Sequence, residues 1–236
     1  MTSVSATELT TVADNLAVFH HGQHVVRHEN LQPDTAYTEH GIDFRTLPRP
    51  EGKLFSVLAT VNDVHFGETE CGRIDDSQLG PIQASLPDEQ PYPITMNAGA
   101  IAEIKRLNPD AVLVKGDLTE SGTDEQFAAF REHYEGAFAD KLFVARGNHD
   151  RYRDQNEFVG DQWIELPGIT IALIDTTIPM QTTGRIDPPQ FEWLNDQLSA
   201  STTPVIIMGH HQQWTEGNRS DDYFGLHPDS SEALDA

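Results

Sequence analysis

The chain has 236 residues, of which 38 are acidic and 15 basic, so its formal net charge is −23. A charge of that sign repels nucleic acid and anionic membranes, which argues against both as partners. It would also repel phosphate esters unless cations neutralise their site, so the composition favours a metal for any phosphate chemistry. Hydrophobic residues make up 37% of the chain, which is enough for one sizeable domain with a buried core and a small appendage.

Cysteine content and the lack of recognisable targeting segments predict a cytoplasmic location. Cys71 is the only cysteine, so no disulfide can form within the chain. The amino-terminal segment lacks the basic start and apolar core of a secretory signal. No apolar run approaches the ~20 residues that a membrane-spanning helix needs.

Residues 1–50 predict a small β extension. Three segments read as short strands, at residues 15–20, 24–30 and 31–47. Four alternating residues resemble the strand and corner of fibronectin-like modules: Leu31, Pro33, Thr35 and Tyr37. The extension is short for a full sandwich. Residues 48–52 (PRPEG) predict a linker, so a second domain is expected over 52–236.

Apolar runs alternate with helical patterns after this linker, which predicts an α/β domain. Strands are expected at 54–61, 111–114, 142–145, 169–174 and 204–208. Helices are expected at 98–107, after the capping-box residue Thr123, after the N-cap Asp187, and at 230–236. Residues 67–93 are rich in Gly, Asp, Ser and Pro and predict a long loop.

Nearly all candidate metal ligands directly follow an expected strand. Asp63 and His65 follow the first strand, and Asp117 follows the second. Asn148, His149 and Asp150 follow the third strand, and His210 follows the fifth. Sites in open α/β sheets form outside the carboxyl ends of the strands, so these side chains are expected on one rim.

The residue types at these positions suit a pair of divalent ions, which need oxygen and imidazole donors and one carboxylate able to bridge. Asp63 and His65 lie two residues apart on an extended segment, so both can point to one side and chelate one ion. Asp117 lies on a Gly-Asp turn and is suited to bridging. Asn148 offers a neutral oxygen, and His210 an imidazole for the second ion.

Together these motifs resemble those of the calcineurin-like metallophosphoesterases: Asp63-Val64-His65, Gly116-Asp117, Gly147-Asn148-His149-Asp150 and Gly209-His210. The resemblance covers about residues 52–236 and is most similar to the class III cyclic-nucleotide phosphodiesterase and purple-acid-phosphatase-like branch. It implies a four-layer αββα sandwich. It also implies metal-dependent hydrolysis of phosphate mono- or diesters, with cyclic nucleotides a candidate substrate.

The resemblance assigns a role to each residue. Five residues would hold two ions of Mn, Fe or Zn: Asp63 and His65 the first, Asn148 and His210 the second, and Asp117 both. A hydroxide between the ions would attack phosphorus. His149 would protonate the leaving oxygen, and Asp150 would orient His149.

The sequence departs from the family pattern at its last motif, Gly-His-x-His, which does not occur after position 211. The nearest candidate is Gly225-Leu226-His227, which has the wrong order and a single histidine. We expect that the chain ends before this motif and lacks two ligands and the strands that complete the fold. A non-catalytic or truncated module that acts as a scaffold or binding protein is therefore the alternative hypothesis.

Several other residues have competing interpretations. Asp175 ends an expected strand and is interpreted as a structural cap, and His211 as a histidine behind the ligands or in solvent. Cys71 is interpreted as a plain loop residue. Five amino-terminal histidines suggest a metal patch, although scattered surface histidines are the favoured interpretation: His20, His21, His24, His28 and His40.

Overall fold

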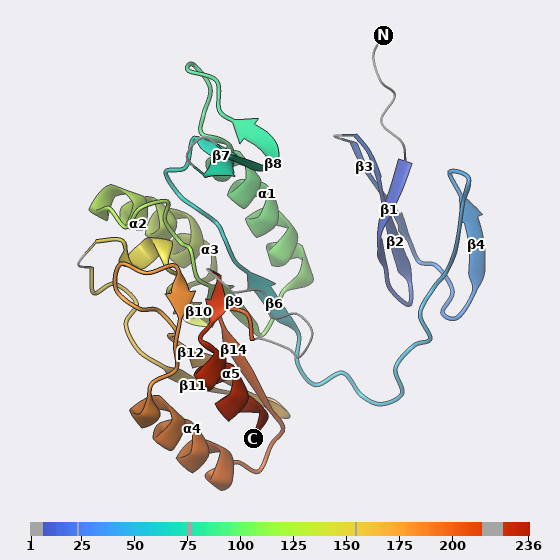
Figure 1. Cartoon of the computed structure of the whole chain (residues 1–236). Coiled ribbons are helices and arrows are strands. Elements are labelled where there is room, and N and C mark those ends of the chain that lie inside the picture. The colour runs from blue at the N-terminus through green and yellow to red at the C-terminus, as the bar shows by residue number, and fades with distance from the viewer. Residues whose placement is uncertain (1–6, 23, 75–76, 154, 214–223) are drawn as a thin grey trace. The chain divides into compact units, whose positions relative to one another are not determined.

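The computed structural model describes residues 7–22, 24–74, 77–153, 155–213 and 224–236 (Figure 1). The chain divides into two compact units, Met1–Leu54 and Phe55–Ala236. Their boundary in the sequence lies just after the expected linker, residues 48–52. No helix within the described ranges combines the length and apolar character needed to cross a membrane.

Two small antiparallel sheets form the first unit. Strands β1 (Thr7–Val12), β2 (Leu16–His21) and β3 (His24–Glu29) pair in that order, and β4 (Ala36–Glu39) pairs with β5 (Ile42–Arg45). Phe19 is fully buried, and its ring lies edge-on to Phe44 at 5.7 Å, so both sheets contribute to one core. The strands expected at 15–20 and 24–30 are confirmed, whereas the segment 31–47 contains two short strands that form a hairpin. β1 was not expected because its threonine-rich sequence lacks a regular apolar alternation.

Two three-stranded sheets form the centre of the second unit. The first has the order β10-β9-β6 and is parallel: β6 (Leu58–Val61), β9 (Ala111–Lys115) and β10 (Leu142–Ala145). The second has the order β11-β12-β14: β11 (Gln162–Leu166), β12 (Ile169–Ile174) and β14 (Val205–Gly209). β12 and β14 are parallel, whereas β11 and β12 are antiparallel. A short parallel pair joins β13 (Thr183–Gly184) to β15 (Gly225–Leu226).

Helices cover the outer faces of these sheets. The main helices are α1 (Tyr92–Leu107), α2 (Asp124–Phe130), α4 (Pro188–Ala200) and α5 (Pro228–Asp235). After α2 the chain continues through a π-helical turn (Arg131–Glu135) and the short α3 (Gly136–Phe138). Thr123 and Asp187 form the expected capping boxes, with Gln126 and Gln190 at the third helical position.

Alternation along the central strands shows how the layers stack. Val112 and Val114 of β9 pack with α1 and α2, whereas Leu113 packs with Ile171 and Leu173 of β12 in the space between the sheets. Ala172 and Ile174 of β12 point to the opposite face of that sheet and pack with Leu194 of α4. The order is therefore helices, sheet, sheet, helices, and the expected αββα sandwich is confirmed.

The structure differs from the expected elements at four points. Residues 67–93 are not a loop throughout, because β7 (Glu70–Ile74) and β8 (Ser77–Ala84) form a hairpin there. α1 starts at Tyr92 rather than at Ala98, with Pro93 in its first turn, where a missing N–H has no cost. β11 was not expected, and the first strand begins only at Leu58.

Candidate metal centre

The structure places the candidate ligands at the carboxyl ends of neighbouring strands. Asp63 and His65 follow β6, Asp117 follows β9, Asn148 follows β10 and His210 follows β14. Backbone hydrogen bonds continue the pairing of the strands into these loops. The Asp63 N–H donates to the Gly116 carbonyl (3.1 Å), and the His65 N–H donates to the Asp117 carbonyl (3.0 Å).

One cavity of about 670 Å³ contains all these side chains in its walls. Its lining comprises Asn62, Asp63, His65, Asp117, Asn148, His149, Tyr152, Thr182, His210, His211, Gln212, Phe224 and Gly225. The family resemblance gave a role to seven residues as ligand, acid or orienting group, and six of the seven line the cavity. The exception is Asp150, which lies behind it.

Asp117 is at the centre of the cluster. It is 4% exposed, and each of its carboxylate oxygens faces a different imidazole. Oδ2 lies 3.5 Å from Nε2 of His65, and Oδ1 lies 3.4 Å from Nε2 of His210. Nε2 of His210 is also 3.2 Å from Oδ1 of Asn148. This geometry suits a carboxylate shared between two ions.

Two groups of three potential ligands share Asp117. His65, Asp117 and His149 form one group, and Asp63, Asp117 and His210 form the other, each with donor atoms within 4.8 Å of one another. This grouping places Asp63 with His210, although Oδ1 of Asp63 is also 3.9 Å from Nε2 of His65. Imidazole and carboxylate donors of this kind suit Mn, Fe and Zn, so the residues present fit a pair of such ions.

Two motif glycines allow the loops to approach one another. A Cβ atom on Gly147 would lie 2.1 Å from Oδ1 of Asp117, and one on Gly116 would lie 2.4 Å from Nδ1 of His210. Gly116 also has φ = +91°, a conformation that other residues rarely adopt. Any larger residue at either position would displace a candidate ligand.

The backbone is strained at three of the candidate ligands. Asp63, His65 and Asp117 have φ values of 54°, 44° and 49°. These left-handed conformations are uncommon for residues other than glycine and cluster at functional sites. The turns aim side chains on adjacent loops toward a common point.

The pKa shifts within the cluster show that its carboxylates favour positive charge nearby. Burial opposes the charged form of His210, but the hydrogen bond and the charge of Asp117 outweigh it and raise its pKa to about 9. Burial alone would raise the pKa of Asp63, but hydrogen bonds with His65 and Asn62 lower it to about 2. Despite its burial, Asp117 has a lowered pKa because of the neighbouring histidines, His210 first.

His149 lies at the edge of this cluster. Its ring is 4.7 Å from that of His65 and 4.7 Å from that of Tyr152, and its backbone N–H donates to Oδ1 of Asp117 (3.0 Å). Its Nδ1 lies 2.6 Å from the carbonyl oxygen of Glu120. This contact requires a proton on Nδ1 and leaves Nε2 as the atom that can exchange a proton.

Asp150 has a different place from the one that the family resemblance implied. Its carboxylate is fully buried and accepts four hydrogen bonds, from the backbone N–H of Gly147 (2.8 Å), Leu118 (3.1 Å) and Thr119 (2.9 Å) and from the Thr119 hydroxyl (2.7 Å). It therefore ties the loop after β9 to the loop after β10. The Glu120 carbonyl, rather than Asp150, orients the ring of His149.

Tyr152 is a site residue that the sequence analysis missed. Its hydroxyl accepts a hydrogen bond from Nδ2 of Asn148 (2.7 Å), which leaves the amide oxygen facing His210. The spacing of four residues from Asn148, about one helical turn, was an available signal.

Asp175 is confirmed as a cap, because it accepts hydrogen bonds from Arg146 (Nε, 2.9 Å) and from the backbone N–H of Thr177 (3.1 Å).

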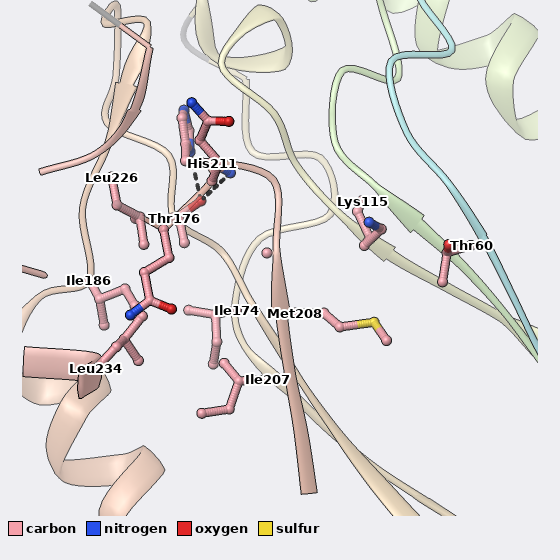
Figure 2. A pocket seen from close by; sticks show the side chains of 13 residues that line it. Thr60, Lys115, Ile174, Thr176, Ile186, Ile207, Met208, His211, Leu226 and Leu234 are labelled. Atoms are coloured by element: carbon pink, nitrogen blue, oxygen red, sulfur yellow. Dashed lines mark hydrogen bonds between the residues drawn. The ribbon is translucent and has the colours of Figure 1, made fainter. Parts of the chain in front are cut away.

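His211 is buried behind His210 and separates the site from a second cavity of about 390 Å³. Figure 2 shows its hydrogen bond with Thr176 (2.7 Å) at one end of this cavity. Burial, together with the charge of His210, lowers the pKa of His211 to about 4. Most other walls are apolar: Ile174, Ile186, Ile207, Met208, Leu226 and Leu234.

The remaining candidates lie as follows. Cys71 is not the loop residue that was expected, because it belongs to β7; it lines a third cavity of about 410 Å³ that also includes Asp63 and His65. Gly225 contributes to the wall of the main cavity. His227, by contrast, precedes α5, and its backbone N–H donates to the Gly184 carbonyl (2.8 Å).

Comparison with known proteins gives a consistent set of relatives. A probable cyclic nucleotide phosphodiesterase from Synechococcus sp. is 28% identical over 135 residues, which cover 55% of this chain and 52% of that protein. A cAMP/cGMP dual specificity phosphodiesterase from Mycobacterium tuberculosis is 26% identical over 180 residues, or 70% of this chain and 50% of that protein. A glycerophosphodiester phosphodiesterase from Enterobacter lignolyticus is 27% identical over 144 residues, or 53% and 51%. The chain thus spans about half the length of these curated relatives.

The fold also has a counterpart of known structure, a dimetal phosphatase from Danio rerio. The two share 11% sequence identity with a TM-score of 0.55, over 68% of this chain and 71% of the other. The model of the calcineurin-like phosphoesterase family matches residues 57–234, which include every candidate ligand. The chain therefore belongs to the calcineurin-like phosphoesterase family.

Proposed function

We propose that this chain hydrolyses phosphodiesters in a metal-dependent reaction, with cyclic nucleotides as candidate substrates. The observation that supports this most directly is the position of Asp117, whose two oxygens lie 3.5 Å and 3.4 Å from the imidazoles of His65 and His210. A buried carboxylate between two imidazoles is suited to a shared position between two ions. The relatives named as phosphodiesterases support the reaction class.

The residues that would hold the metals are the five strand-end ligands: Asp63, His65, Asp117, Asn148 and His210. Bound cations would neutralise the charge of the phosphate and lower the pKa of an attacking water. This would overcome the repulsion that a chain of net charge −23 exerts on an anionic substrate. Mn, Fe and Zn all suit these donors.

His149 would supply a proton to the leaving oxygen. The Glu120 carbonyl holds the proton on Nδ1, so Nε2 is the atom that gives a proton up and takes one back. The backbone N–H of His149 also donates to Asp117, so the acid and the shared ligand are held in one arrangement. Tyr152 keeps the Asn148 oxygen turned toward His210.

The size of the cavity and the net charge of the chain both bear on the class of substrate. A space of about 670 Å³ that opens to solvent fits a small ester. The strongly negative chain disfavours a nucleic acid, which would require a basic groove. We therefore favour a small phosphodiester over a polymer.

The test is turnover by the full chain with Mn²⁺ added to metal-stripped protein. Bis-p-nitrophenyl phosphate, p-nitrophenyl phosphate and 3′,5′-cyclic AMP would be compared, with His149→Ala as the impaired variant and the exposed His24→Ala as the control. We expect Mn²⁺-dependent diester hydrolysis that His149→Ala reduces and His24→Ala does not. No metal-stimulated turnover of any substrate, together with less than one tightly bound ion per chain, would instead establish a non-catalytic module.

A further inference from the structure

Three histidines of the first unit lie close together, and two of them pack against the same aromatic side chain. Phe19 of β2 is fully buried, and the rings of His28 and His40 lie 5.3 Å and 5.0 Å from its ring. The ring of His21 lies 4.6 Å from that of His40, and the rings of His28 and His40 are 5.2 Å apart. These three histidines come from β2, β3 and the turn between β4 and β5, so the fold of this unit brings them together.

Two of these imidazoles have the spacing of ligands to a common ion. Nε2 of His28 lies 3.1 Å from Nε2 of His40. Two nitrogen ligands on a tetrahedral zinc ion, with Zn–N bonds of about 2.0–2.1 Å, are about 3.3 Å apart. The pair can therefore receive an ion after a shift of a few tenths of an ångström.

Nδ1 of His21 and Nδ1 of His28 face different neighbours. Nδ1 of His21 is 2.8 Å from the hydroxyl of Thr7, which is a hydrogen bond. Nδ1 of His28 is 3.9 Å from a carboxylate oxygen of Glu39, which is beyond hydrogen-bond distance. A carboxylate near the second nitrogen of a histidine favours a proton there and leaves Nε2 as the ligand atom.

His40 lies in the turn between β4 and β5. This is a two-residue hairpin turn, and His40 (φ = 52°) and Gly41 (φ = 78°) both have the left-handed conformation that such a turn requires. The turn places the ring of His40 against those of His21 and His28.

We propose that His21, His28 and His40 form a binding site for a transition-metal ion such as Zn²⁺ or Ni²⁺, made only of residues of the first unit. Imidazole donors suit these ions and not Mg²⁺ or Ca²⁺, which prefer oxygen. His28 and His40 provide the first two ligands. The ligand nitrogens of the three histidines do not all lie within 4.8 Å of one another, so His21 provides the third ligand only after its side chain breaks the hydrogen bond with Thr7 and rotates. A fourth position is left for water, because the side chain of His40 is exposed. The site is independent of the proposed phosphodiesterase activity and shares no residue with its metal centre.

The alternative is that the contact between His28 and His40 is an ordinary hydrogen bond between neutral rings. The test counts zinc in the full chain after removal of metal with a chelator and dialysis against buffered Zn²⁺. Wild type would be compared with His28→Gln and His40→Asn, with His20→Gln as the control. His20 is on the same strand as His21, one residue away, and therefore points to the opposite face of the sheet.

We expect each of the two variants to lose one bound zinc ion relative to wild type, whereas His20→Gln retains it. The ions of the other centre are present in every protein, so they cancel in the comparison. Asn tolerates the left-handed conformation at position 40, so His40→Asn keeps the turn even if His28→Gln unfolds the sheet. An unchanged zinc count in His40→Asn, or an equal loss in His20→Gln, would overturn the proposal.

Discussion

Nδ1 of His149 lies 2.6 Å from the backbone carbonyl oxygen of Glu120, which follows β9 by five residues. The orientation of the proposed acid is thus set by a backbone group, not by the adjacent carboxylate of Asp150. A backbone carbonyl can only accept a hydrogen bond, so it holds the proton on Nδ1 of the ring.

The first prediction concerns proton donation by His149. His149→Gln retains a polar side chain but has no titratable group, so we expect kcat for a diester with a poor leaving group to fall by about 10²–10⁴. The loss should be smaller for an activated aryl ester, whose leaving group needs no proton. Steady-state kinetics with both substrates checks this, and an equal loss for both would contradict a role in protonation.

Asp150→Asn is expected to lower stability. The amide NH₂ would face N–H donors that now share a carboxylate oxygen, so the free energy of unfolding should fall by about 2–4 kcal/mol. Urea denaturation of the metal-free proteins measures this. Asp140→Asn, at an exposed position, is the matched control and should change stability by less than about 0.5 kcal/mol.

Gly147→Ala should weaken metal binding. The new Cβ would lie 2.1 Å from Oδ1 of Asp117, so the shared carboxylate must move and we expect weaker metal binding with loss of turnover. Gly99→Ala adds the same methyl group on α1, where no atom lies within 4 Å, and should leave metal binding unchanged. Calorimetric titration with Mn²⁺ tests both variants, and equal affinity in Gly147→Ala and wild type would argue against this packing role.

Metal affinity should rise with pH. A metal and a proton compete for Nε2 of His210, whose pKa is raised to about 9 in the metal-free protein. Below that pKa the proton must leave before the ion binds, so we expect affinity to increase by up to about tenfold per pH unit for one displaced proton. Titrations at about pH 6, 7 and 8 in buffers of different ionisation enthalpy count the protons released. A pH-independent affinity with no proton release would contradict it.

Much of the fold could be predicted because its signals are local. The continuous apolar runs of β9, β10 and β12 and the capping boxes at Thr123 and Asp187 depend on residues close in sequence. The hairpin of β7 and β8 was missed, since its Gly-, Ser- and Pro-containing sequence has the composition of a loop. β11 was missed although it forms a local hairpin with β12 across Pro167 and Gly168, because its short sequence QWIEL is a weak strand pattern by itself.

The sequence by itself determined the family and the kinds of donor atom, because each motif places its residues directly after a strand and parallel strands end at one rim. Only the tertiary structure decided which atoms meet. It placed one imidazole beside each carboxylate oxygen of Asp117. It paired the Asp150 carboxylate with backbone N–H groups and the His149 ring with the Glu120 carbonyl. It also brought together His28 of β3 and His40 of the turn between β4 and β5. These pairings depend on how loops distant in sequence pack and turn, and local propensity carries no information about contacts between such loops.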